Sequence, residues 1–443
     1  MTVPLADSTP GDREPQVLIT GASAVTAAGP TAGAAWESVL AGRSGIGPIR
    51  QWDASGWPCG IAGEIPDFDP RALVPDRKLH KLLSRMDLLG LKAVHDAVAE
   101  AGLLVYREVL TEEQRGLFNE RTALVVASGG ANYRNQYDYF PLLTRSQGDM
   151  KVFGAELLSC VSPMWLLRTL PNNVLCYAGV QTGFKGPNAN FTSHSASGAL
   201  AILEAARMIR CGEADRAVVV GYDAPVEPQA VLFYSGLGIL SAASLRPFDA
   251  RRDGSILGEG AAALVLETPE SARRRGVRPR GTILGGAVAS EGEGLLPLRD
   301  DGDGVLRALQ GALASSGLEP RDVHLVTAHG NGTPRSDASE GRAILRCFGT
   351  GSRGTPSVTA FKWAIGHLLA ASGMVEAVLT LKALGEGVAP GIAPLERLDP
   401  ELAGLGAARE HRPLEGGPAR TGLVICRGFG GLAGAVVLRA IGS

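Results

Sequence analysis

The sequence predicts an α/β fold. Short apolar runs alternate along the chain with longer segments of helical periodicity, which is the pattern of strands and helices packed in layers. The chain has 443 residues, 45% of them hydrophobic, and 59 glycines, enough for a large core and many tight turns. The expected strands are the apolar runs at residues 17–20, 122–127, 217–220, 261–266, 325–328, 423–426 and 434–438. The expected helices are the periodic segments at 34–41, 88–101, 200–210, 304–315, 337–347 and 373–384.

The most informative segment is residues 186–198, which has the composition of a strand end, a tight turn and a helix start. The run that follows, residues 199–210, is rich in strong helix formers and has almost no polar face, so we expect a buried helix. A small polar residue at its start would face unsatisfied N–H groups, which favour developing negative charge. A nucleophile that attacks a carbonyl needs such an environment. Ser195 is therefore the first catalytic candidate.

Composition excludes several classes of protein. No apolar run approaches the roughly 18 to 20 residues that a membrane span requires, and residues 1–16 are polar without a signal-peptide core. We therefore expect a cytoplasmic protein with no membrane partner. The net charge of −2 gives no general attraction to nucleic acid. The glycines of residues 21–29 lack the GxGxxG spacing of a dinucleotide site.

The six cysteines are scattered and form no CxxC pair, so the sequence indicates neither a metal site nor a disulfide framework. We expect most of them to be buried small apolar residues. Cys426 is the exception to consider, because it lies two residues before Gly428 in a glycine loop. It is an alternative source of a reactive thiol.

Several motifs in order resemble the β-ketoacyl synthases, the thiolase-like condensing enzymes that include the type II fatty acid and type II polyketide ketosynthases. They begin near residue 16 and run to the C-terminus. In this family the turn at residues 186–198 carries a cysteine nucleophile, and Ser195 takes its place here. The other matching blocks are residues 17–29, 36–46, 246–249, 254–260, 328–334, 361–367 and 428–431.

The resemblance implies a layered αβαβα fold built from two similarly folded halves, residues 16–267 and 268–443, with residues 273–280 as a surface connection. It also implies roles for individual residues. His329 and His367 would bind the malonyl thioester oxygen, and Lys362 would tune the site electrostatically. Glu340 would be the acidic partner in the helix after the first histidine. The amides of Ser195 and Phe429 would form an oxyanion hole, with Phe429 also the gate and Thr333 a contact to the phosphopantetheine arm.

The serine changes the expected chemistry. The pKa of a thiol can be lowered toward neutrality, whereas an alcohol must give its proton to a base as it attacks. His329 or His367 could be that base. The resulting oxoester is less electrophilic than a thioester. We therefore expect Ser195 to favour acyl transfer or slow condensation over rapid repeated elongation. His194 has no role in the family and is expected to pack or to face solvent.

Other residues that depart from the family pattern are expected to line or support the pocket. They are Asn331 and Gly332 in place of small hydroxyl residues, Arg427 in place of an aromatic residue, and Leu432-Ala433 in place of Thr-Asn. They favour a specialised acyl substrate, as in polyketide-like secondary metabolism. Two alternatives stay open: a non-condensing partner resembling the chain-length factors, and a malonyl-carrier decarboxylase without a covalent intermediate. Replacing Ser195 by alanine distinguishes covalent catalysis from both.

The partners implied by the resemblance are an acyl carrier protein and a second ketosynthase-like subunit. Arg77, Lys78, Lys81 and Arg85 are expected to form the basic edge of a helix, which would either dock the acidic carrier or be a solvated face. The family dimerises through the strand that precedes the nucleophile, so we expect a homodimer or a heterodimer with a related synthase. No cofactor beyond the carrier's own phosphopantetheine is implied.

Overall fold

A computed structural model describes residues 15–66, 69–130, 137, 139–350 and 355–441. In this part of the chain the main sheet has ten strands. The first five are β1 (Val17–Thr26), β4 (Thr122–Ser128), β5 (Asn188–Phe191), β6 (Arg216–Asp223) and β7 (Gly260–Glu267). The other five are β8 (Gly281–Ser290), β9 (Leu325–Thr327), β10 (Ser357–Thr359), β13 (Thr421–Arg427) and β14 (Leu432–Ala440). Two short ribbons pair β2 (Gly47–Pro48) with β3 (Ile61–Ala62) and β11 (Val388–Ala389) with β12 (Arg412–Pro413).

The sheet consists of two halves with the same topology. The order is β5-β4-β6-β7-β1 in one half and β10-β9-β13-β14-β8 in the other. In both halves the two strands nearest the outer edge run parallel to each other and to the third, and the remaining pairings are antiparallel. Antiparallel pairing of β1 with β8 joins the halves. The expected α/β fold with two similar halves is confirmed, and the division between residues 267 and 268 stays a prediction.

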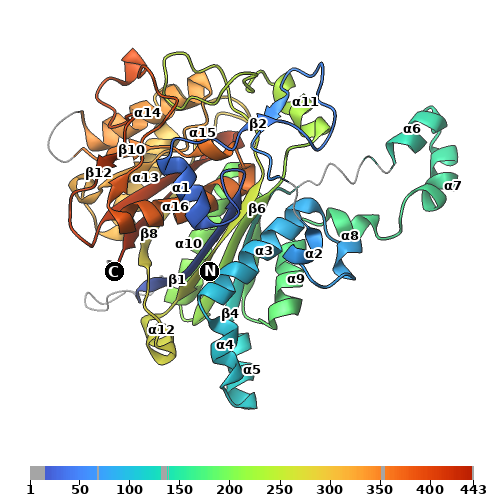
Figure 1. The fold of residues 1–443 in the computed structure, drawn as a ribbon, viewed down its shortest axis with the longest axis horizontal. Helices are drawn as coiled ribbons and strands as arrows, with labels where there is room; N and C mark the ends of the chain where they lie inside the picture. Colours follow the sequence, from blue (N-terminus) through green and yellow to red (C-terminus); the bar gives the residue numbers. More distant parts are fainter. Residues whose placement is uncertain (1–14, 67–68, 131–136, 138, 351–354, 442–443) are drawn as a thin grey trace, which may run out of the picture.

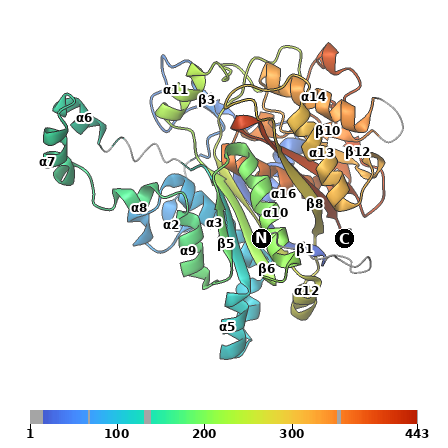
Figure 2. The same cartoon turned by 180° about the vertical axis from the view of Figure 1, so that it is seen from behind.

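Two helices lie between the halves and form the central layer. α10 (Ser197–Arg210) contacts β4 and β6 of the first half and also β8 and β14 of the second. α16 (Ser372–Glu386) contacts β13 of its own half and β7 of the other (Figures 1 and 2). Outer layers are formed by α3 (Arg85–Glu100) on the first half and α13 (Asp303–Ser316) on the second.

All seven expected strands and all six expected helices are present. The remaining predicted helices are α1 (Ala32–Leu40) and α14 (Pro334–Phe348). Sequence patterns missed the short strand β10 and also β8, whose adjacent glycines weaken a strand signal. The expected connection at 273–280 begins inside α12 (Pro269–Arg275), and Gly276 is the C-cap of that helix. Helices that were not expected are α2 (Pro70–Leu73), α4 (Leu103–Glu108), α5 (Glu112–Glu120), α6 (Phe140–Ser146), α7 (Met150–Cys160), α8 (Trp165–Thr169), α9 (Asn173–Thr182), α11 (Pro228–Gly236) and α15 (Lys362–Ile365). None of the helices in the described part of the chain has the length and apolarity that a membrane crossing requires.

The two central helices begin in the same way. A 3-10 turn precedes each one, His194–Ala196 before α10 and Leu369–Ala371 before α16. The first residue of each turn has positive φ, 47° at His194 and 43° at Leu369. A serine at the start of each helix accepts a backbone N–H from four residues earlier, at 2.7 Å in α10 and 3.0 Å in α16. This shared local structure fixes the turn that carries Ser195.

The helix starts approach each other at glycines. A Cβ atom on Gly198 would lie 2.8 Å from the backbone nitrogen of Met374 and 3.2 Å from the Cα of Gly373. Real Cβ contacts are longer, so only glycine allows this approach. The position of the Ser195 turn relative to the second half therefore depends on backbone-to-backbone packing.

Gly198→Ala should destabilise the protein by about 1–3 kcal/mol, because the added methyl group meets backbone atoms that cannot rotate away. Thermal unfolding followed by circular dichroism measures the effect. Gly116→Ala in α5 is the matched control, since nothing lies within 4 Å of the added atom. It should leave stability unchanged or raise it by up to about 1 kcal/mol. An unchanged midpoint for Gly198→Ala would contradict the packing described here.

Candidate active site

Ser195 lies where the sequence placed it, immediately before α10. It occupies the 3-10 turn between β5 and α10 and is 3% exposed. Its Oγ lies 3.0 Å from Nε2 of His367. A serine hydroxyl at hydrogen-bond distance from an imidazole nitrogen is the arrangement of an activated nucleophile and its base. Of the two expected histidines, the structure therefore pairs His367 with Ser195.

His367 and His329 are held by their backbones. The amide of His367 donates to Ile256 O at 2.7 Å, and its carbonyl accepts the Gly258 amide at 3.0 Å. His329 follows β9 and is 2% exposed. The two imidazole rings meet edge to face with centroids 5.2 Å apart. The second half of the fold thus presents both rings to the cavity that Ser195 of the first half also lines.

Lys362 is fully buried at the start of α15. Its ammonium donates to Glu376 Oε1 at 2.5 Å and to the carbonyl oxygen of His329 at 2.6 Å. Burial lowers the pKa of His367 and of His329 well below the usual value, and the positive charge of Lys362 lowers the pKa of both further. Both histidines are therefore neutral near pH 7. A neutral imidazole is the form that can accept the proton of Ser195.

Glu340 is buried in α14 and accepts hydrogen bonds from the backbone of the loop that carries His329. Its two carboxylate oxygens accept the amides of His329 at 2.7 Å and of Gly330 at 2.9 Å. The ion pair of Lys362 is formed with Glu376, which the sequence analysis missed. A signal was present, because Glu376 is the single charged residue in the otherwise uncharged stretch 373–381. A buried charge in such a run requires a charged partner.

A cavity of about 400 Å³ opens onto Ser195. His329, His367, Thr333 and Phe429 all line it, so the structure brings the expected residues to one place. Thr333 is half-buried and precedes α14, with its hydroxyl bonded to Asn331 Oδ1 at 2.8 Å. One wall of the cavity is apolar and is formed by Tyr234, Leu237, Ile239, Leu240, Leu257 and Leu369. This wall suits the aliphatic part of an acyl group.

Phe429 stands among other rings at the cavity. It stacks on Tyr234, with centroids 6.1 Å apart and an interplanar angle of 13°, and meets His194 edge to face at 5.1 Å. His194 is exposed and packs on Phe429, as expected, and it also lines the cavity. Tyr234 was not anticipated from the sequence, because no local pattern connects α11 with the active site.

Two expectations about other residues are wrong, and the alternative of a reactive thiol at Cys426 is excluded. Cys160, Cys176 and Cys211 are exposed and Cys347 is partly exposed, so most of the cysteines are not buried. Cys426 is 1% exposed, and burial raises the pKa of its thiol to about 12, so it cannot supply a thiolate.

The basic segment is not the edge of one helix. Lys78 precedes the 3-10 turn Leu79–Lys81 and Lys81 ends it, and the turn lies before α3. Arg85 donates to Glu259 with its Nε at 2.7 Å, so a buried carboxylate engages its charge.

Comparisons with known proteins agree with this geometry. The models of the N-terminal and C-terminal domains of β-ketoacyl synthase match residues 14–272 and 280–396. A curated relative, 3-oxoacyl-[acyl-carrier-protein] synthase 2 of Synechocystis, is 32% identical over 395 residues, 87% of this chain and 89% of that protein. The chain belongs to the β-ketoacyl synthase family.

Solved structures show the same fold. A β-ketoacyl synthase from Burkholderia phymatum superposes with a TM-score of 0.84 at 26% identity, covering 96% of this chain and 100% of that one. The ishigamide ketosynthase/chain length factor gives a TM-score of 0.83 at 26% identity, covering 97% of this chain and 100% of that one. The thiolase-like ketosynthase fold is thereby confirmed.

Removing the buried charge pair should move the pH dependence of Ser195 acylation. Lys362→Met combined with Glu376→Gln removes a positive charge that lowers the pKa of both histidines, so each pKa should rise. Because the base acts when neutral, the acid limb of the pH-rate profile should move to higher pH. The control is Lys382→Met with Glu386→Gln, a partly exposed pair on α16, which should leave the profile in place. An unmoved acid limb in the buried double variant would contradict the electrostatic role of Lys362.

Lys362→Met alone should destabilise the protein by about 3–5 kcal/mol, because it leaves the Glu376 carboxylate buried without its cation. Urea unfolding followed by tryptophan fluorescence measures the loss. Adding Glu376→Gln should restore much of it, since the second change removes the orphaned charge. A single variant as stable as the unmodified protein would show that the pair is not the buried contact described here.

Proposed function

We propose that this β-ketoacyl synthase homologue is an acyl-transferring enzyme that uses Ser195 as its nucleophile on acyl or malonyl groups carried by an acyl carrier protein. The observation that carries the proposal is the 3.0 Å contact of Ser195 Oγ with His367 Nε2. The names of the curated relatives support the carrier-bound substrate, since they are 3-oxoacyl-[acyl-carrier-protein] synthases.

In the proposed acylation, Ser195 Oγ attacks the thioester carbonyl carbon while its proton moves to His367 Nε2. The oxyanion forms beside α10 and would be held by the amides of Ser195 and Phe429, and Phe429 would act as the gate. As the carbon–sulfur bond breaks, His367 returns the proton to the departing thiol. Thr333 lines the cavity and would contact the phosphopantetheine arm.

The second half-reaction determines the type of enzyme. His329 and His367 could bind the oxygen of a malonyl thioester as it becomes an enolate, while Lys362 supplies positive charge behind them. The serine ester is a weaker acceptor for that carbanion than a thioester would be. The proposal is therefore acyl transfer or slow condensation, in polyketide-like or specialised fatty-acyl synthesis.

A second subunit fits the exposed edge of the sheet. β5, the strand before Ser195, is the last strand in the order on its side of the main sheet. Beyond it, α7 and α8 carry exposed apolar residues that include Met150, Leu158 and Leu166. We propose that β5 pairs with a second copy or with a related synthase, and that the chain binds a carrier protein. The likeness to a ketosynthase/chain length factor keeps a non-condensing partner as the second candidate.

Intact-protein mass spectrometry after incubation with acyl- and malonyl-carrier thioesters tests the proposal. The unmodified chain should gain an acyl adduct that maps to Ser195, and Ser195→Ala should gain none. A Lys362→Arg variant is unsuitable as a control, because that side chain lies in the buried ion pair. Arg307→Gln on the exposed face of α13 serves instead and should be acylated normally. No adduct together with no malonyl decarboxylation would contradict the proposal and favour the non-condensing partner.

A further inference from the structure

The cavity beside Ser195 contains a third histidine that the proposed acylation does not use. His194 directly precedes the nucleophile, is exposed, and lines the cavity together with His329 and His367. In the described part of the chain its imidazole contacts the ring of Phe429 but has no hydrogen-bond partner. Packing alone therefore holds this side chain in position.

The backbone of the turn places residue 194 at the cavity. His194 has a φ of 47°, and Leu369, the first residue of the matching turn before α16, has a φ of 43°. Both residues line the cavity. A residue other than glycine rarely has positive φ and keeps it only where the surrounding structure imposes it. Because leucine occupies the matching position, the turn imposes the backbone conformation, and the histidine side chain needs another explanation.

Two rings contact Phe429, and they differ in how easily they can move. His194 meets it at an interplanar angle of 82° with centroids 5.1 Å apart, and Tyr234 stacks on it at 13° and 6.1 Å. Tyr234 is 3% exposed, so the surrounding core holds its ring in place. The exposed imidazole can change rotamer without disturbing the core. Of these two contacts, the one with His194 is therefore the one that can open.

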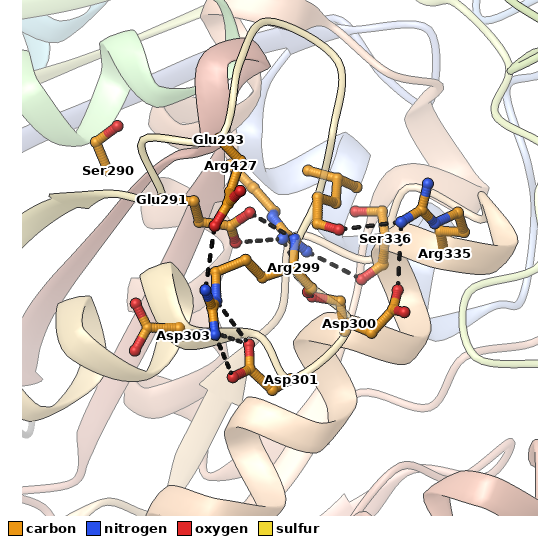
Figure 3. A network of polar contacts seen from close by, with 12 residues as sticks. Ser290, Glu291, Glu293, Arg299, Asp300, Asp301, Asp303, Arg335, Ser336 and Arg427 are labelled. Atoms are coloured by element: carbon orange, nitrogen blue, oxygen red, sulfur yellow. Dashed lines mark hydrogen bonds and ion pairs between the residues drawn. The ribbon is translucent and has the colours of Figure 1, made fainter.

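The backbone around Phe429 is anchored on both sides. Before it, the guanidinium of Arg427 donates to Glu291 Oε1 at 2.8 Å, as Figure 3 shows. After it, the amide of Gly430 donates to Leu295 O at 2.8 Å. With the backbone fixed in this way, movement at Phe429 begins with rotation of its side chain, which the two ring contacts oppose.

The serine ester of the proposed function needs protection from water. An ester on Ser195 beside the neutral imidazole of His367 is also the arrangement of a hydrolase. Water would add to the ester carbonyl carbon and give its proton to His367 Nε2. The bond from that carbon to Ser195 Oγ would then break, and His367 would return the proton to Oγ as a carboxylic acid leaves. Transfer to a carrier thiol follows the same steps, so exclusion of water decides which acceptor reacts.

We propose that His194 is a positioning residue that holds Phe429 closed over the Ser195 ester and thereby favours transfer to a thiol over hydrolysis. The inference rests on the proposed serine-dependent acyl transfer. A single contact between two rings is weak enough for an arriving pantetheine arm to displace, because the arm makes many contacts with the cavity wall. A water molecule gains too few contacts to do so.

The lifetime of the acyl-enzyme tests the proposal. The protein is labelled with hexanoyl-pantetheine, the excess reagent is removed by gel filtration, and loss of the adduct is followed by intact-protein mass spectrometry. His194→Asn removes the ring, and asparagine tolerates positive φ. This variant should lose the adduct about two- to tenfold faster, the effect expected for one aromatic contact. His194→Phe keeps a ring against Phe429 and should keep the lifetime, as should the distant control Arg307→Gln.

Three outcomes would overturn the proposal. An unchanged lifetime in His194→Asn would show that the ring does not protect the ester. A shorter lifetime in both His194 variants would show that the contact with Phe429 is not the cause. A longer lifetime in both would identify His194 as a base for the attacking water. Thermal unfolding of each variant confirms that the protein compared is folded.

Association with the Ser195→Ala protein reports on the same contact without the nucleophile. Stopped-flow fluorescence with a dansyl-labelled hexanoyl-pantetheine measures how fast the cavity admits the arm. Adding His194→Asn should raise the association rate about two- to tenfold, because the open position of Phe429 is populated more often. Adding His194→Phe should not, and equal rates in all three proteins would overturn the proposal. If the unmodified chain forms no acyl adduct, the proposed function fails, whereas these rates still report on His194.

Discussion

The active site depends on one fully buried cation. Lys362 has no contact with solvent and is neutralised by Glu376 on the central helix α16. Because the same ammonium donates to the carbonyl of His329, it fixes the position of the first histidine loop as well as the local charge. Burial, and after it the positive charge of Lys362, lowers the pKa of both imidazoles, and a neutral imidazole is the form that could accept the proton of Ser195. Nucleophile activation and loop geometry therefore have a common origin.

The central layer of helices connects the parts of the site that come from the two halves of the fold. Ser195 belongs to the half that contains α10, and its partner His367 belongs to the half that contains α16. The contact between them depends on how closely the two helix starts approach, and that distance is set by Gly198 and Gly373. The repeated topology of the two halves is thus more than an architectural feature, because it brings the starts of α10 and α16 into contact.

The local sequence was sufficient to predict the site residues that lie in continuous motifs. Ser195, His329, His367 and Phe429 were predicted because each lies in a short continuous motif that resembles the family pattern. Partners remote in sequence were not predictable in this way. Glu376 forms an ion pair with Lys362 from a different helix, and Arg85 donates to the carboxylate of Glu259, 174 residues away. The burial of Cys426 likewise follows from the packing of β13 against α16, which no local pattern encodes.

On the proposed function, the alcohol at position 195 makes the acyl-enzyme an oxoester that transfers its acyl group more readily than it condenses. Ser195→Cys restores the thioester while leaving the histidines and the buried ion pair in place. The direct measurement is the rate of β-ketoacyl product formation from acyl- and malonyl-carrier thioesters, compared between the two proteins by mass spectrometry. We expect a clearly higher rate of carbon–carbon bond formation for the cysteine variant. Condensation by the unmodified protein as fast as by the variant would contradict it.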